Sequence, residues 1–167
     1  MQGGFEELCC QLAHYELPRQ GSRFIRKKAP DAGVECYWAL PNGDEWAWQA
    51  KYFTTRPTDE QWRDLDESVS RALDKHKRLT RYIVCIPVDR QDPRIEDQSW
   101  FMDKWDERVQ KWTSWANDRS MSVEYEYWGD HEIFVRLSRE EHAGRRYFWF
   151  NREQLSQEWF ENRLEKL

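Results

Sequence analysis

The chain has 167 residues and a formal net charge of -5, with charged residues at 34% and aromatic residues at 16%. This length suits one domain with a substantial core, to which aromatic side chains contribute large buried areas. The acidic balance argues against a tight, autonomous binder of nucleic acid, because affinity for phosphates comes from Lys and Arg. No apolar run approaches the length of a membrane span or a signal-peptide core, so we expect a cytoplasmic protein with no membrane partner.

The cysteines have no metal-ligand spacing; they are Cys9, Cys10, Cys36 and Cys85. We expect them to be buried, reduced thiols. No His stands at a place that suggests a cysteine nucleophile. The sequence also lacks the GxxxxGK(S/T) phosphate loop, so we expect no ATP hydrolysis by this chain.

The chain starts with a predicted helix over residues 4–15, in which apolar residues recur at helical spacing. Glu6 and Glu7 then fall in its first turn, where the helix dipole favours negative charge. Pro and Gly end this helix, and residues 22–28 are predicted to form the first strand.

The next stretch, DAGVECYWALPNGDEWAWQAK over residues 31–51, is predicted to form two strands joined by a tight turn. Both strands alternate with period 2, which is typical of strands with two different faces. The apolar face consists of Val34, Cys36, Trp38 and Leu40 in the first strand and Trp46, Trp48, Ala50 and Tyr52 in the second. The other face carries polar side chains in both strands.

The length of the hairpin loop decides which side chains meet. A two-residue loop would separate Glu35 from Gln49 and Lys51 by the sheet. A three-residue loop over residues 42–44, with one residue in the left-handed conformation, sets Glu35 opposite Lys51 and Trp38 opposite Trp48. Only an odd loop length buries both apolar sets on one face, so the pattern predicts that the three polar side chains share the second face.

A carboxylate, an amide oxygen and an ammonium group on one small patch have a chemical use. The oxygens of Glu35 and Gln49 can hold a hard cation such as Mg²⁺, which keeps most of its waters. Lys51 can then orient an attacking water or stabilise charge on a phosphate. The alternative is a cross-strand Glu-Lys pair on a solvated face, which is common and weak.

The remaining elements follow from helical or strand periodicity. The first two are a helix that Thr58 caps and that ends near residue 78, and a strand buried on both faces over 80–88. A helix over 99–117, a strand over 122–128 and a short helix over 129–137 follow. The last two are a strand or extended piece over 142–150 and a helix from Asn151 to the chain end. The Trp residues of the helix over 99–117 keep the helical period, which favours a core role over base stacking.

Two clusters of basic residues provide local positive charge for nucleic acid despite the net charge of -5. They are Arg19, Arg23, Arg26, Lys27 and Lys28, and Lys75, Lys77, Arg78 and Arg81. Each cluster is either a contact for nucleic acid or a solvated face. If DNA is the substrate, several copies of the chain would be needed to hold it.

Three motifs carry a resemblance to a known family: FEEL near the start, GVE on the first hairpin strand and QAKYF on the second. They resemble the Mrr-type branch of the PD-(D/E)xK nucleases, and more narrowly the nuclease domains at the N-terminus of antiviral STAND NTPases in bacteria. The resemblance covers roughly the first half of the chain and, more loosely, the C-terminal part. It implies an α/β (α+β) fold with a restriction-endonuclease-like α-β-β-β-α-β core, a mixed central sheet and flanking helices, and the predicted element order agrees with this.

The resemblance also implies roles for individual residues. Glu35 and Gln49 match the side-chain metal ligands of the family, and the carbonyl of Ala50 is a third ligand. Lys51 matches the catalytic lysine, and Glu6 matches an acidic residue that completes the site. The implied metal is Mg²⁺, with Mn²⁺ as a substitute.

The sequence departs from the family pattern at two positions. Glu35 stands where the wider superfamily usually has Asp, and Gln49 is neutral, which implies weaker metal affinity. Asp31 is an alternative acid for the site.

The resemblance implies an endonuclease effector of antiphage defence that cuts double-stranded DNA. Residues 1–167 would form one effector domain, with a core over 1–128 and an extension over 129–167, cut from a longer STAND NTPase and activated when its copies assemble. Two alternatives stay open: an inactive fold that serves as an assembly or nucleic-acid-binding module, and a protein-interaction domain with an aromatic surface.

Overall fold

The computed structural model describes residues 2–27, 33–88 and 96–150. The helices are α1 (Gln2–His14), α2 (Asp59–Lys75), α3 (Glu96–Asp118), α4 (Asp130–Leu137) and α5 (Ala143–Phe150), with a short 3-10 helix η1 (Glu140–His142). The strands are β1 (Arg23–Arg26), β2 (Cys36–Ala39), β3 (Glu45–Ala50), β4 (Leu79–Cys85) and β5 (Glu124–Trp128). The first six elements follow the predicted order α-β-β-β-α-β.

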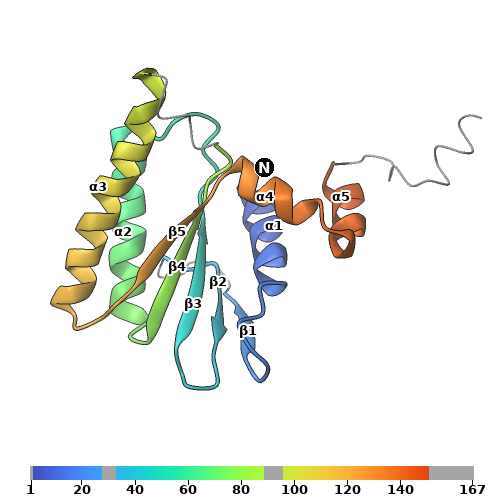
Figure 1. Ribbon diagram of the computed structural model, residues 1–167, viewed down its shortest axis with the longest axis horizontal. Coiled ribbons are helices and arrows are strands. Elements are labelled where there is room, and N and C mark those ends of the chain that lie inside the picture. Colours follow the sequence, from blue (N-terminus) through green and yellow to red (C-terminus); the bar gives the residue numbers. More distant parts are fainter. Residues whose placement is uncertain (1, 28–32, 89–95, 151–167) are drawn as a thin grey trace, which may run out of the picture.

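The five strands form one sheet in the order β1-β2-β3-β4-β5. The pairs β1-β2 and β2-β3 are antiparallel, whereas β3-β4 and β4-β5 are parallel. Figure 1 shows α2 and α3 on one face of this sheet and α1 and α4 on the other. The protein is therefore a mixed α/β fold whose mixed sheet is flanked by helices, as predicted.

The start of α2 is fixed by side-chain capping. Thr58 accepts a hydrogen bond from the Gln61 N–H at 3.2 Å, and the Gln61 side chain accepts one from the Thr58 N–H at 2.9 Å. This capping box satisfies two backbone donors that the helix would otherwise leave unpaired. The apolar residues buried on α2 recur at helical spacing and are Trp62, Leu65, Val69, Ala72 and Leu73.

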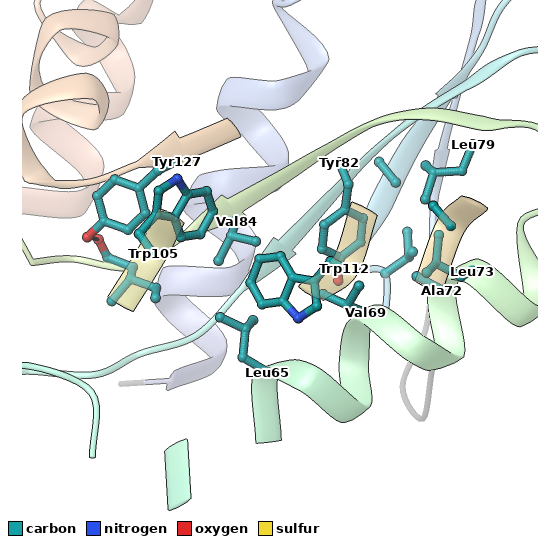
Figure 2. Packing of buried hydrophobic residues seen from close by; sticks show 14 of the residues in the cluster. Leu65, Val69, Ala72, Leu73, Leu79, Tyr82, Val84, Trp105, Trp112 and Tyr127 are labelled. Atoms are coloured by element: carbon teal, nitrogen blue, oxygen red, sulfur yellow. Dashed lines mark hydrogen bonds between the residues drawn. The ribbon is translucent and has the colours of Figure 1, made fainter. Parts of the chain in front are cut away.

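Strand β4 lies between β3 and β5 and is buried on both faces, as predicted. Tyr82 and Val84 point towards α2 and α3, where they pack with Leu65 and Trp112 (Figure 2). Trp105 and Trp112 of α3 thus belong to the core, which confirms the prediction from their spacing. On the other face, Ile83 packs under α1 and α4.

The second core, between the sheet and α1, contains all four cysteines. They are free and buried: Cys9, Cys10, Cys36 and Cys85. Burial raises the pKa of the Cys36 and Cys85 thiols well above its usual range. These thiols are therefore packing groups, as predicted, because a buried neutral thiol is a poor nucleophile.

The hairpin has the predicted loop length but not the predicted register. Its loop spans residues 41–43, because the Leu40 N–H donates to the Asp44 carbonyl at 2.8 Å. Trp38 lies opposite Trp46 and Cys36 opposite Trp48, so the predicted pairings of Trp38 with Trp48 and of Glu35 with Lys51 are both wrong. Gly43 supplies the left-handed residue at φ 91°. This loop length is also odd. From Cys36 onward, the side chains of both strands therefore point to the predicted faces of the sheet.

Val34 is an exception to the predicted faces. It packs in the core beneath α2 and α3, whereas Cys36 packs beneath α1. The alternation therefore fails between these two residues, because the regular strand begins only at Cys36.

The predicted strand or extended piece over residues 142–150 is wrong, because this segment forms α5. A contact with a distant segment accompanies the helix: the Trp149 indole donates to the Gln11 side chain at 3.1 Å. Nearer in the chain, Arg146 donates to the Arg139 carbonyl at 2.8 Å. Large apolar side chains of α4 and α5 stay exposed, among them Phe134 at 68% and Phe148 at 74%. The predicted helix from Asn151 onward lies outside the described residues.

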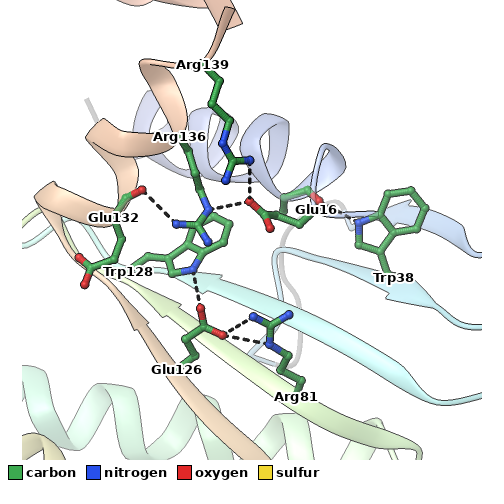
Figure 3. A network of polar contacts seen from close by, with 9 residues as sticks. Glu16, Trp38, Arg81, Glu126, Trp128, Glu132, Arg136 and Arg139 are labelled. Carbon is green, nitrogen blue, oxygen red and sulfur yellow. Dashed lines mark hydrogen bonds and ion pairs between the residues drawn. The ribbon is translucent and has the colours of Figure 1, made fainter. Parts of the chain in front are cut away.

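A network of charged side chains joins α4 to α1 (Figure 3). Arg136 lies 3.8 Å from the centre of the Trp128 ring and donates to Glu16 at 2.7 Å. Glu126 accepts from the Trp128 indole at 3.1 Å and from Arg81. These contacts fix α1, the helix that carries Glu6, against the sheet.

Among the described residues, no helix combines the length and apolar character that crossing a membrane requires.

His142 gives this region a pH-dependent stability. Burial lowers the pKa of His142, and the neighbouring Arg145 lowers it further. The folded protein therefore favours the neutral His142 ring. The contribution of this ring to the free energy of unfolding is present above the unfolded pKa of about 6.5 and is lost as pH falls through the folded pKa. We expect the unfolding temperature to fall from pH 7 to about pH 5, and to fall less in His142→Phe. The exposed His131→Gln variant should behave like the wild type, and an unchanged pH profile in His142→Phe would contradict this assignment.

Candidate functional site

The predicted site residues lie at the end of β3. Gln49 and Ala50 are the last two residues of that strand, and Lys51 follows, with its N–H donating to the Cys85 carbonyl at 2.9 Å. Glu35 precedes β2 and donates its N–H to the Trp48 carbonyl at 2.8 Å. Backbone hydrogen bonds to neighbouring strands therefore hold the site residues of both strands.

The Gln49 side chain is the centre of the site. Its Nε2 donates to Glu35 Oε1 at 3.0 Å and to the Ala50 carbonyl at 3.3 Å. The predicted proximity of Glu35 and Gln49 is thus confirmed. Gln49 is only 4% exposed, so this member of the polar patch is buried rather than solvated.

The charges of two other predicted site residues, Glu6 and Lys51, affect the pKa of Glu35. Burial raises the pKa of Glu35, and the nearby Glu6 carboxylate raises it further. Arg26, the hydrogen bond from Gln49 and the charge of Lys51 act in the opposite direction. Because the folded pKa exceeds the unfolded one, the stability linked to this group is present at low pH and lost as pH rises through the folded pKa. The fold therefore holds a carboxylate here at the expense of stability, which is common at functional sites.

Two acids have alternative roles in the sequence-based prediction: Glu6 as a negative charge at the start of the helix, and Asp31 as an acid of the site. Helix α1 begins at Gln2, so Glu6 and Glu7 lie beyond its first turn, and their predicted place in that turn is wrong. A role in compensating the helix dipole is thereby weakened, since that effect falls off within the first turn. Asp31, the alternative acid, lies outside the described residues.

The contacts of Arg26 with the site are not predictable from the sequence. Its guanidinium donates to the Glu35 carbonyl at 3.0 Å, lies 3.7 Å from the Glu35 carboxylate and donates to Glu7 at 3.3 Å. The pairing of Arg26 with Cys36 in the β1-β2 ladder brings these groups together. No local pattern reveals this contact, because it depends on the register of two strands.

Gly33 lets the chain pass close to α2 just before Glu35. Its φ is +76°, and a Cβ atom there would lie 1.9 Å from the Ser68 carbonyl oxygen of the helix. The Tyr82 hydroxyl donates to the Gly33 carbonyl at 2.6 Å. Only glycine suits this combination of a left-handed backbone and a backbone contact.

Replacing Gly33 by Ala should therefore destabilise the protein strongly. We expect a loss of more than about 3 kcal/mol in the free energy of unfolding, because the new Cβ adds both strain and a clash with rigid backbone. Urea denaturation measures this loss. Gly3→Ala is the control: no atom lies within 4 Å of its new Cβ in α1, and a helical Ala is favoured. Equal stabilities of the two variants would contradict the packing described here.

The donor set of the site fits a hard cation. Two oxygens, Glu35 Oε1 and the Ala50 carbonyl, converge on the Gln49 amide, which supplies a third oxygen of its own. Such oxygens suit Mg²⁺, which needs few protein ligands, although a single adjacent carboxylate gives modest affinity. Among the residues that the structure describes, no group of three or more His, Cys, Asp and Glu side chains could hold a metal. A cation here would thus depend on the amide and carbonyl oxygens.

Comparisons with known proteins add no family assignment. A scan against protein-family models and a search of curated proteins both find no match for this chain. The geometry of the site is therefore the basis for a functional proposal.

Proposed function

We propose that this chain is a Mg²⁺-dependent DNA endonuclease of the PD-(D/E)xK type, which hydrolyses phosphodiester bonds as an effector of bacterial antiphage defence. The observation that supports it is the convergence of Glu35, Gln49 and the Ala50 carbonyl at the end of β3, with Lys51 next in the chain. The order α-β-β-β-α-β and the resemblance of the motifs at these residues favour the same proposal.

The proposed roles follow from the chemistry of each group. Glu35, Gln49 and the Ala50 carbonyl hold Mg²⁺ or Mn²⁺, and Glu6 adds a carboxylate nearby. A cation held there would supply Lewis-acid stabilisation of a phosphate oxygen and activation of a water molecule. The Lys51 ammonium orients the water or balances the charge that builds on the phosphate.

Assembly of several copies is part of the proposal because one copy is a poor DNA binder. Several of its basic side chains are already paired within the chain: Arg26 with Glu7, Arg78 with Asp44 and Arg81 with Glu126. Arg19, Arg23, Lys75 and Lys77 are exposed. Linking weak sites raises overall affinity without any new contact, so clustering would bring double-stranded DNA into reach.

The test is plasmid cleavage with Mg²⁺ or Mn²⁺ by the chain and by an artificially clustered form. We expect cutting that EDTA stops, that clustering increases and that Glu35→Gln abolishes. Glu67→Gln is the matched control, since Glu67 is an exposed acid on α2 that pairs only locally with Arg71 at 3.2 Å in the contacts described. A folded protein that cuts in neither form would refute the nuclease and leave an inactive fold.

A second candidate function is an assembly module without catalysis. The exposed aromatic side chains of α4 and α5 favour it, because apolar surface of this kind can bind a second protein copy. They include Phe134, Tyr147, Phe148 and Phe150. Copies of the chain that sediment as an oligomer, revert to monomers in Phe148→Ser and cut no DNA would support this function over the first.

A further inference from the structure

The orientation of the Gln49 amide is dictated by its two partners. Glu35 Oε1 belongs to a carboxylate and the second partner is the Ala50 carbonyl, at 3.0 and 3.3 Å from Gln49 Nε2. An ionised carboxylate and a carbonyl can only accept hydrogen bonds, so the NH₂ end of the amide must face them. The opposite orientation would bring three oxygens together in a buried site, which is unfavourable.

A cation reverses this requirement. The oxygens that accept from the Gln49 NH₂ group are the two that would bind the cation, and of the amide only Oε1 can join them as a ligand. The last side-chain torsion of Gln is broad and roughly two-fold. Turning the amide over therefore exchanges its nitrogen and oxygen while the backbone of β3 stays paired with β2 and β4.

We propose that the Gln49 carboxamide is a two-state latch on the metal site. Its NH₂ group takes the place of the cation in the metal-free protein, and it turns over to present Oε1 when a cation binds. This inference rests on the proposed metal site and adds a cost to occupying it, because two hydrogen bonds must break first. The latch keeps the site closed at low cation concentration and explains why a neutral residue serves at this position.

Gln49→Glu removes the latch and adds a negative ligand. The metal-free variant has two carboxylates facing each other, which a divalent cation relieves. We expect Mg²⁺ to bind this variant at least about tenfold more tightly than the wild type, as measured by calorimetry on the full chain. Equal or weaker binding by Gln49→Glu would overturn the latch.

The rotation itself has a direct readout in the side-chain NH₂ signals of glutamine in nitrogen-15 NMR spectra. Comparison with Gln49→Glu identifies the Gln49 pair, which should shift during a Mg²⁺ titration as its two hydrogen bonds are lost. Gln110 is an internal control, because it is exposed on α3 and lies outside the proposed ligand set. Its signals should stay in place.

The outcomes separate this inference from the function on which it rests. Mg²⁺ binding with a shifted Gln49 pair and a fixed Gln110 pair supports the latch. Heat of Mg²⁺ binding with an unmoved Gln49 pair overturns the latch and leaves the metal site standing. No binding of Mg²⁺ or Mn²⁺ at millimolar concentration refutes the metal site, and the latch with it.

Discussion

Replacing Lys51 by Ala should reduce metal-dependent plasmid cleavage at least about 100-fold, the usual loss when one charge-stabilising or proton-handling group is removed. The half-buried Lys51 follows β3, close enough to Glu35 for its charge to lower the pKa of that carboxyl. The Lys51 charge therefore acts on one of the proposed metal ligands. The variant should keep its Mg²⁺ affinity, because Lys51 supplies no ligand oxygen.

Lys75→Ala is the control for this prediction. Lys75 ends α2 next to His76, whose ring contacts Glu45 at 2.7 Å. Glu45 begins β3, so this lysine lies near the opposite end of the strand from Lys51. Initial rates of plasmid cleavage at saturating Mg²⁺ compare the two variants. Similar losses in both would mean that Lys51 acts only as general positive charge for DNA binding.

Replacing Asp66 by Ala should cost about 3–5 kcal/mol in the free energy of unfolding, as expected when one partner of a buried ion pair is removed. Asp66 is 6% exposed on α2, and its carboxylate accepts from three side chains of α3. The donors are Arg108 at 2.6 Å, Lys111 at 2.9 Å and Trp112 at 2.8 Å. The variant leaves Arg108, with 14% of its side chain exposed, without this partner.

Asp74→Ala is the matched control for Asp66→Ala. Asp74 also joins α2 to α3, by a contact with Arg119 at 2.9 Å, but its side chain is 57% exposed. Exposed pairs contribute little because water screens them, so urea denaturation should show a small change. Asp66→Asn should fall between the two, since an amide oxygen can still accept one hydrogen bond. An Asp66→Ala variant as stable as Asp74→Ala would show that the buried carboxylate does not join the helices.

The sequence by itself determined the elements that have a strong period. The capped, amphipathic helix α2 and the apolar run of β4 formed as predicted, because spacing along the chain fixes which side chains a regular element can bury. The nearness of Glu35 and Gln49 was also predictable. Strand alternation has period 2, so any odd loop keeps both apolar sets of the hairpin on one side.

Tertiary structure decided what depends on contacts between distant segments. The hairpin loop spans residues 41–43 rather than 42–44, which shifts the pairing by one residue on each strand. Both registers put the same side chains on the same faces, so the alternation of apolar and polar residues cannot distinguish them. Residues 142–150 form a helix because of contacts such as Trp149 with Gln11. The place of Arg26 against Glu35 likewise follows from strand pairing. Local periodicity carries no information on such partners, because their energies arise only once the chain has folded.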